Sequence, residues 1–424
     1  MASAMTLYHY TTTKLGQYWG YLSLIVFWPA FEFLHFHWEV SWPFMNLGNW
    51  LGQITIIIQW YEYTGVLGGT LWILLVNILL FESSSLFYRK KNCPAAVLII
   101  ASILLIISPI IFSYKILNKQ TKAKEQISAL IIQPNINPYT EKYNSSLFEQ
   151  QIKEQIETAK ENVNEKIQLI IYPEASFPMF LHKDSLFVNK DIIELQKITQ
   201  NNKGTNIIVG LYTYELQNND SLYYNTAVCL NQEGFYAMHN KSKLVPAVEK
   251  TPFADYFRFL KNRNVDFGGI TSSLALSSKQ TFFRTKQANI ATLICYESVF
   301  GEYVSSFVKN GAEILTVTTN DAWWGNTPAY KQILMHSQLR AIETRRSVVR
   351  SANTGISCLI DKYGVIKNAL PINKKAVLSV LAEKNHKLTF YVKYGDYLGR
   401  LSVYVSAVVL LVLGLGRLTQ KRRK

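Results

Sequence analysis

Three reactive side chains each follow a separate apolar run: Glu174, Lys241 and Cys295. Cysteine is the strongest side-chain nucleophile near neutral pH, but it reacts as the thiolate, which a neighbouring base or cation must favour. Ligands of α/β sheets gather at the carboxyl ends of strands, so three side chains at such ends are expected to meet. The pattern predicts a cysteine nucleophile, a carboxylate base and an ammonium group that stabilises a thiolate and an oxyanion.

A structural interpretation of the same residues stays open. A lone cysteine in an apolar run is as typical of a hydrophobic core as of a reactive site. Glu174 and Lys241 are equally compatible with surface loops. Pro173 and Pro246, which lie close to them in the sequence, restrict the backbone and favour a fixed geometry, and therefore a site.

The other cysteines show no functional spacing. Neither a disulfide framework nor the paired spacing of a zinc site is present, so no metal is predicted. Two of these cysteines lie in strand-like runs and one lies beside a basic loop: Cys229, Cys358 and Cys93.

Alternating strands and helices must position the three reactive residues. Short apolar runs rich in β-branched residues predict buried strands. They occur at residues 129–133, 169–173, 206–210, 226–230, 290–295, 314–318 and 357–360. Helices are predicted at about 146–165, 184–200 and 328–346. This order is typical of an α/β domain with two sheets covered by helices.

Apolar segments flank this domain. Four runs have roughly the length needed to cross a hydrocarbon core of about 30 Å. They are residues 18–36, 64–81, 95–112 and 397–416, and a Trp-rich stretch at 37–62 is predicted to be an interfacial arm. We therefore predict a membrane domain at 1–116 with about three transmembrane helices. A globular domain at 117–396 follows, and then a last helix with a basic tail at 397–424.

The formal net charge of +15 does not indicate nucleic-acid binding, because no nucleic-acid motif accompanies it. The densest basic clusters, Arg89–Lys91 and Lys421–Lys424, lie beside apolar spans. Basic residues mark the cytoplasmic ends of membrane spans. Both clusters are consistent with one topology, in which residues 117–396 lie outside the cytoplasm.

The motifs around the reactive residues resemble those of the nitrilase, or carbon–nitrogen hydrolase, superfamily. These motifs are Tyr172-Pro173-Glu174, Lys241-Ser-Lys-Leu-Val-Pro246 and Cys295-Tyr296-Glu297. The flanking spans narrow the resemblance to its membrane-bound branch, the apolipoprotein N-acyltransferases of bacterial inner membranes. The resemblance implies a nitrilase-like α-β-β-α sandwich inserted between transmembrane helices. Relatives have more spans before the point where this sequence begins. Three explanations stay open: a membrane domain shortened at its N-terminus, helices supplied otherwise, or a misassigned start site.

The resemblance also implies roles for individual residues. Cys295 is expected to be the nucleophile, Glu174 the general base and Lys241 the oxyanion-stabilising cation. Five further residues are expected to shape the site or the substrate path: Asn225, Glu249, Tyr296, Glu297 and Trp324. For Glu249 and Glu297 we favour support over proton transfer, whereas the Trp323-Trp324 pair fits a lid and simple packing equally well.

The implied reaction is N-acylation of the N-terminal S-diacylglyceryl cysteine of lipoproteins, through a cysteine thioester and without a cofactor. The expected partners are a phospholipid acyl donor, a diacylglyceryl-modified apolipoprotein acceptor and the membrane. The expected location is the bacterial inner membrane, with several spans and the catalytic domain on the periplasmic side. Two alternatives stay open: a membrane-tethered amidase, and an inactive shortened paralogue that binds lipoprotein or lipid.

Overall fold

A computed structural model describes residues 1–119, 125–217, 220–253, 256, 274–325 and 327–421. The chain forms two compact units. The first combines residues 1–120 with 389–424, and the second comprises residues 121–388. The predicted division after residue 116 lies four residues before the first bound, and that after residue 396 lies eight residues beyond the second.

The first unit is helical. Its α-helices are α1 (Ala2–Leu15), α2 (Gln17–His35), α3 (Tyr61–Tyr88), α4 (Asn92–Asn118), α9 (Phe390–Tyr394) and α10 (Tyr397–Lys421). Within the described residues, three helices are long and apolar enough to cross a membrane: α3, α4 and α10 as far as Gly414. Helix α2 covers the first predicted span but is not among them. It carries Glu32 and His35, which lower its hydropathy.

The predicted Trp-rich arm is a series of short 3-10 helices at Pro43–Met45, Leu47–Gln53 and Thr55–Ile57. The buried Glu32 carboxylate ties it to the helices, because its oxygens accept hydrogen bonds from Leu47 N at 2.9 Å and Thr70 Oγ1 at 2.6 Å. The Trp50 ring remains 77% exposed. The arm is therefore anchored through its backbone while it presents apolar side chains outward.

The second unit contains two sheets. In the first, the strand order is β13-β1-β2-β4-β5-β6, with β3 beside β4. Its strands are β1 (Gln126–Gln133), β2 (Leu169–Ile171), β3 (Phe180–His182), β4 (Asn206–Gln217), β5 (Asp220–Asn231), β6 (Gly234–Asn240) and β13 (Ala376–Glu383). In the second, the order is β12-β11-β10-β9-β8-β7. Its strands are β7 (Phe283–Arg284), β8 (Asn289–Ile294), β9 (Ile314–Thr319), β10 (Val348–Ala352), β11 (Cys358–Ile360) and β12 (Ile366–Ala369).

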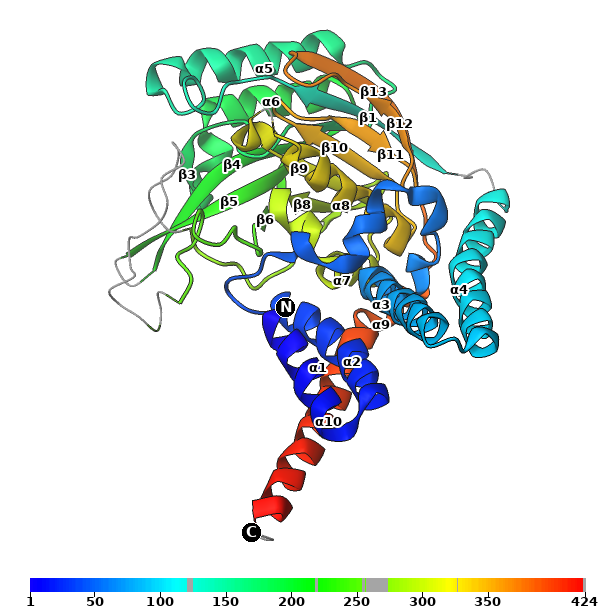
Figure 1. The fold of residues 1–424 in the computed structure, drawn as a ribbon. Coiled ribbons are helices and arrows are strands. Elements are labelled where there is room, and N and C mark those ends of the chain that lie inside the picture. Colours follow the sequence, from blue (N-terminus) through cyan, green and yellow to red (C-terminus); the bar gives the residue numbers. More distant parts are fainter. Residues whose placement is uncertain (120–124, 218–219, 254–255, 257–273, 326, 422–424) are drawn as a thin grey trace. The chain divides into compact units, whose positions relative to one another are not determined.

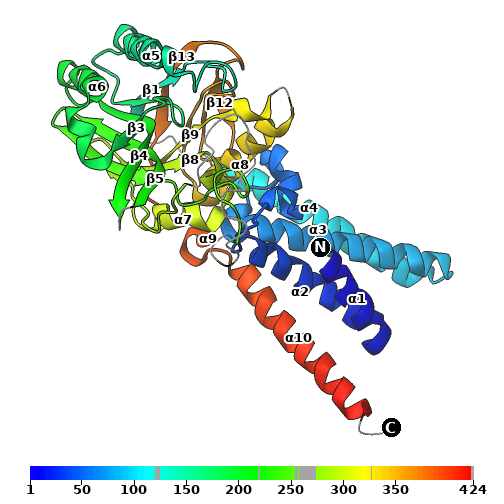
Figure 2. The ribbon, with the colours of Figure 1, turned by 90° about the vertical axis from the view of Figure 1, so that its left-hand side faces the viewer.

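Helices cover the outer face of each sheet (Figures 1 and 2). Helices α5 (Phe148–Asn162) and α6 (Lys190–Asn201) pack on the first sheet, and α7 (Gly301–Lys309) and α8 (Ala329–Thr344) pack on the second. The inner faces of the two sheets share one apolar core, to which Ile131, Ile208 and Ile290 contribute. The predicted α-β-β-α sandwich is thus confirmed.

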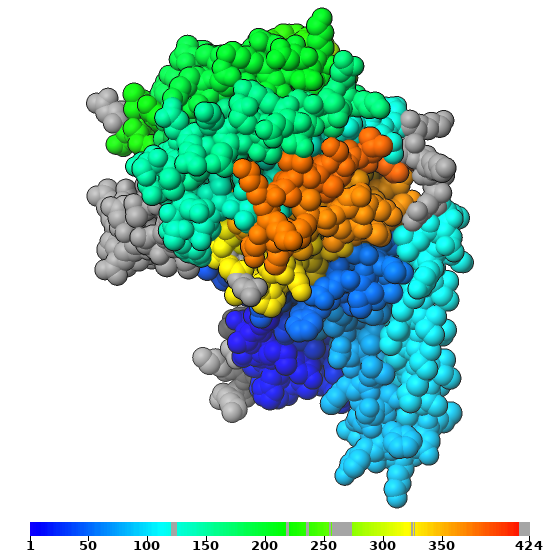
Figure 3. Space-filling model, turned by 90° about the horizontal axis from the view of Figure 1, so that it is seen from above, coloured from blue at the N-terminus to red at the C-terminus, as the bar shows by residue number. Residues whose placement is uncertain are grey.

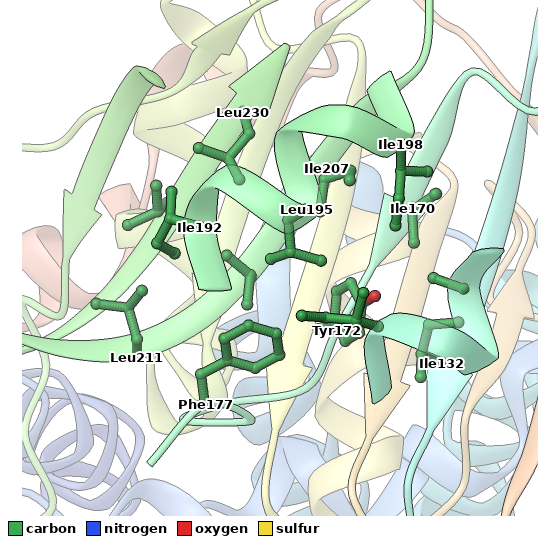
Figure 4. Close-up of a cluster of buried hydrophobic side chains, with 14 of the residues drawn as sticks. Ile132, Ile170, Tyr172, Phe177, Ile192, Leu195, Ile198, Ile207, Leu211 and Leu230 are labelled. Atoms are coloured by element: carbon green, nitrogen blue, oxygen red, sulfur yellow. The ribbon is translucent and has the colours of Figure 1, made fainter. Parts of the chain in front are cut away.

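A second apolar core lies between the first sheet and its helices (Figure 4). Ile192, Leu195 and Ile198 recur at helical spacing on α6 and meet Ile207 and Leu230 of the sheet. This spacing of three residues places one face of α6 on the strands. The same core includes Ile170 of β2 and Tyr172, so it holds the strand end that leads to Glu174.

The two ends of the second unit's chain pair with each other. Strand β13 runs antiparallel to β1, from Gln126 opposite Glu383 to Gln133 opposite Ala376. Figure 3 shows the late segment in orange against the early segment in teal. Strands β1, β2 and β4 are mutually parallel, as are β8, β9 and β10. Each set therefore directs its carboxyl ends to one edge, where ligands of such sheets gather.

Candidate active site

The structure brings the three predicted reactive residues together from three strand ends. Glu174 follows β2, Lys241 follows β6 and Cys295 follows β8. Lys241 Nζ lies 2.9 Å from Glu174 Oε1, and Cys295 interacts electrostatically with both groups. Their catalytic roles stay predictions, but the proximity that those roles require is present.

The Glu174 carboxylate is buried and fully supplied with donors. Its Oε1 accepts from Asn225 Nδ2 at 2.8 Å and from Lys241 Nζ, and its Oε2 accepts from the backbone N–H of Asn320 at 3.1 Å. Burial alone would raise the pKa of the Glu174 carboxyl, but the Lys241 ammonium lowers it below its usual value. Glu174 is therefore an ionised acceptor in a fixed orientation.

Lys241 is shared between two carboxylates. Its Nζ donates to Glu174 Oε1 and, at 2.7 Å, to Glu249 Oε1, and its side chain is almost fully buried. Burial would lower the pKa of this ammonium, but the two acids raise it well above its usual value. The pKa of Glu249 is raised by burial, even though Val245 N donates to its Oε2 at 2.8 Å. The pKa values of the Glu174 and Glu249 carboxyls are thus shifted in opposite directions around one cation.

Cys295 has an unusual backbone conformation. Its φ is +49°, in the left-handed region that side chains disfavour, and it begins the 3-10 helix Cys295–Val299. Such strain is typical of functional sites. Burial and the Glu174 charge raise the pKa of the Cys295 thiol to about 12, despite the opposing effect of Lys241. The resting thiol is therefore protonated at neutral pH, and the reaction needs a base at the moment of attack.

Glu297 links the nucleophile segment to the Lys241 segment. Its fully buried carboxylate accepts four hydrogen bonds: from Ile294 N at 2.8 Å, His239 Nε2 at 3.1 Å, Ser242 N at 2.7 Å and Tyr303 Oη at 2.6 Å. Burial would raise the pKa of Glu297, but His239 and these donors lower it. Glu297 therefore bonds to segments on both sides of the site, and its supporting role stays a prediction.

The Glu297→Gln protein should lose activity because an amide cannot accept four hydrogen bonds. In either orientation its NH2 group would face a backbone N–H, that of Ser242 or that of Ile294, and leave this donor unpaired, at a cost of about 1–3 kcal/mol. We expect slower Cys295 labelling by iodoacetamide together with a lower thermal denaturation temperature in detergent. The control is Glu165→Gln, a change at an exposed acid. Wild-type stability and labelling in Glu297→Gln would contradict the positioning role.

Two of the remaining predicted site residues, Asn225 and Tyr296, have described contacts in the structure. Asn225 supports both Glu174 and Lys241, because its backbone carbonyl accepts from Lys241 N at 2.8 Å. Tyr296 is buried, with its ring edge-on to Phe300 at 5.2 Å between centroids. The side chain of Trp324 lies outside the described part of the structure.

The neighbouring Trp323 is packed between two tyrosines. It stacks on Tyr143 at 6.1 Å and meets Tyr139 edge-on at 5.6 Å. Tyr139 Oη also donates to the Trp323 carbonyl at 3.0 Å. The surroundings of Trp323 are therefore those that the packing interpretation expects.

Sequence reasoning missed Lys142. Its side chain is 2% exposed, and its Nζ donates to the backbone carbonyl of Glu174 at 3.0 Å. It lies in a polar loop between β1 and α5, where a lysine is normally solvated, so no pattern in the sequence marks it.

Metal ligation has no support among the described residues. There, no three His, Cys, Asp or Glu side chains are grouped in a way that could hold an ion. The carboxylates of Glu174 and Glu249 already form ion pairs with Lys241. The arrangement instead fits nucleophilic chemistry at a carbonyl carbon.

A cysteine beside a carboxylate–lysine pair, on strand ends of an α-β-β-α sandwich, defines a nitrilase-type enzyme class. Comparison with known families agrees with that assignment. The chain belongs to the carbon–nitrogen hydrolase family, which matches residues 129–382. Residues 1–79 match the apolipoprotein N-acyltransferase N-terminal domain. The resemblance of the sequence motifs to these two families is confirmed.

Relatives named apolipoprotein N-acyltransferase are similar to this chain over most of its length. The protein from Chlorobaculum tepidum is 25% identical, over 96% of this chain and 79% of its own length. The proteins from Thermotoga maritima and Geobacter metallireducens are 29% and 26% identical, each over 92% of this chain and 70% and 73% of their own lengths. The similarity thus includes the apolar segments as well as the sandwich.

Proposed function

We propose that this chain is a membrane-bound acyltransferase that moves an acyl chain from a phospholipid to the N-terminal S-diacylglyceryl cysteine of a lipoprotein. The observation that carries the proposal is the buried Glu174–Lys241 pair, 2.9 Å apart, next to Cys295. The similarity to proteins with that name and the three apolar helices support a lipid substrate.

In the first step, Cys295 Sγ attacks the ester carbonyl carbon of the phospholipid while its proton passes to Glu174. Because burial makes the thiolate costly, we expect proton transfer and C–S bond formation to occur together. The Lys241 ammonium and a backbone N–H beside Cys295 stabilise the oxyanion. The intermediate collapses as the C–O bond breaks, and the leaving lysophospholipid oxygen takes the proton from Glu174. The product on the protein is a thioester.

In the second step, the α-amine of the lipoprotein cysteine attacks the thioester carbonyl and gives a proton to Glu174. The C–S bond breaks, and Cys295 regains that proton while the amide leaves. A thioester suits this order because it persists in water yet reacts readily with amines. The scheme requires ping-pong kinetics, with lysophospholipid released before the acceptor reacts.

The proposed topology follows the basic clusters. Arg89–Lys91 and the C-terminal Lys421–Lys424 are assigned to the cytoplasm, which directs α4 outward and α10 inward. The second unit then lies on the periplasmic side of the bacterial inner membrane. Both substrates are anchored in the outer leaflet of that membrane, so they reach the site from the same side.

The direct test uses the purified full chain in lipid vesicles with a phospholipid whose acyl chain is labelled. We expect label to pass to a synthetic peptide that begins with S-diacylglyceryl cysteine, with one lysophospholipid formed per transfer. The same peptide with an acetylated α-amine is the control and should receive none. Parallel double-reciprocal plots at several peptide concentrations would support the two-step order.

Two outcomes would contradict this proposal. Hydrolysis of a small soluble amide in the absence of lipid, without transfer to the peptide, would favour the tethered amidase. Binding of the peptide without any label transfer or thioester would favour the inactive paralogue.

A further inference from the structure

A second buried ammonium lies next to the catalytic carboxylate. Lys142 Nζ donates to the Glu174 backbone carbonyl at 3.0 Å. It also lies 3.1 Å from the side-chain amide of Asn320. With this amide in the orientation that satisfies its neighbours, the Asn320 oxygen accepts from Lys142 Nζ and, at 3.2 Å, from Trp323 Nε1. The backbone N–H of Asn320 in turn donates to Glu174 Oε2 at 3.1 Å. Lys142 therefore joins the two turns that hold the Glu174 carboxylate.

The turn that Lys142 contacts is strained. Ala175, directly after Glu174, has φ at +44°, in the left-handed region that residues other than glycine disfavour. Strained backbone of this kind persists where surrounding contacts enforce it. The hydrogen bond from Lys142 to the Glu174 carbonyl is one such contact.

Lys142 differs from Lys241 in how its charge is balanced. Lys241 makes ion pairs with two carboxylates, whereas the hydrogen-bond acceptors around Lys142 are a backbone carbonyl and an amide. Within the described residues, no direct ion pair neutralises the charge of Lys142. This charge therefore acts on the neighbouring groups of the site. The titratable groups that face it are Glu174 and Cys295. Cys295 in turn faces Glu174, Lys241 and Asp321.

We propose that Lys142 is a positioning residue and the second cation of this site: it joins the Glu174 and Asn320 turns, and its charge favours the Cys295 thiolate. The inference extends the proposed function, because it matters for catalysis only if Cys295 is the nucleophile. Lys241 would act on the oxyanion of the substrate, while Lys142 acts on the charges of the protein's own base and thiol.

The charge on Lys142 depends on pH. Burial lowers the pKa of this ammonium to about 8, although Glu174 and Cys295 oppose that effect. The cation is therefore present at neutral pH and is lost as the pH rises through that value. A purely structural contact would not produce a pH-dependent effect on the thiol.

The test measures iodoacetamide labelling of Cys295 between about pH 6 and 10, quantified on the Cys295 peptide by mass spectrometry. Removing a positive charge near the thiol raises its pKa, so Lys142→Met should label about tenfold more slowly near pH 7. The ratio of wild-type to variant rates should approach one above pH 9, where wild-type Lys142 is also neutral. The control is Lys153→Met on the exposed side of α5, and labelling of the exposed Cys93 serves as an internal reference.

The wild-type profile provides a second measurement that needs no variant. Labelling should rise less than tenfold per pH unit around pH 8, because the thiol loses its neighbouring cation there. Equal rates in wild type and Lys142→Met, a rate ratio independent of pH, or a wild-type profile without this reduced slope would each overturn the proposal. Labelling reports on the thiol and not on acyl transfer, so a failure of the proposed function is distinguishable from a failure of this inference.

Discussion

The Cys295→Ala protein should transfer no acyl chain, with a rate at least about 10³-fold below wild type. Alanine cannot form the thioester, and no other group in the site replaces it, because the two carboxylates are held by Lys241. The measurement is incubation with acyl-labelled phospholipid, followed by detection of a protein adduct that hydroxylamine removes. The same protein should still bind phospholipid vesicles.

The matched control is Cys93→Ala, because Cys93 is an exposed free cysteine outside the sandwich. It should retain full adduct formation and transfer. A hydroxylamine-sensitive adduct of normal yield on Cys295→Ala would show that another residue is the nucleophile. The assignment of the site would then be wrong, whatever the product of the reaction.

The Glu174→Gln protein should be slower by about 10²–10⁴-fold in both adduct formation and transfer to the peptide. Glutamine preserves the shape of the side chain but cannot take the thiol proton. Lys241 would keep Glu249 as its ion-pair partner, at 2.7 Å, so the buried ammonium is not left without a counter-charge. Single-turnover measurements of each step separate the effect on adduct formation from the effect on transfer to the peptide.

Thiol labelling distinguishes loss of a base from general disruption. The Glu174 charge raises the pKa of Cys295, so its removal should lower that pKa and speed iodoacetamide labelling of Cys295. Faster labelling with slower acyl transfer is the expected combination, whereas a disrupted site would reduce both. The control is Glu215→Gln, which changes a carboxylate paired with Lys183 instead of Lys241. Wild-type acyl transfer in Glu174→Gln would exclude Glu174 as the base.

Much of this site was predictable because its reactive residues follow strands that are recognisable locally. The runs that end before Glu174 and Cys295 are apolar and short, and the structure has β2 and β8 there. Parallel strands direct their carboxyl ends to a common edge, so residues at those ends were expected to meet before any contact was known. Each of these motifs is formed by residues that are adjacent in the sequence, so it can be recognised without the tertiary structure.

Contacts between distant segments were not predictable in the same way. Strand β13 was absent from the sequence prediction, because its pattern is only half-buried and its partner β1 lies about 250 residues earlier. Strand β10 was not predicted from an apolar run, although it is buried and lies parallel to β9. These pairings decide which strands share a sheet, and they depend on the whole chain.

The amino-acid order alone was sufficient for the family, the sandwich class, the apolar segments and the meeting of Glu174, Lys241 and Cys295. The family follows from the resemblance of the motifs around Glu174, Lys241 and Cys295, and the other features follow from local hydrophobic periodicity and from residue types at strand ends. Tertiary structure alone decided that Lys241 is shared with Glu249, that Glu297 accepts four hydrogen bonds and that Lys142 is buried beside Glu174. Charge and burial depend on which groups the folded chain brings within a few ångströms, and sequence spacing does not encode those distances.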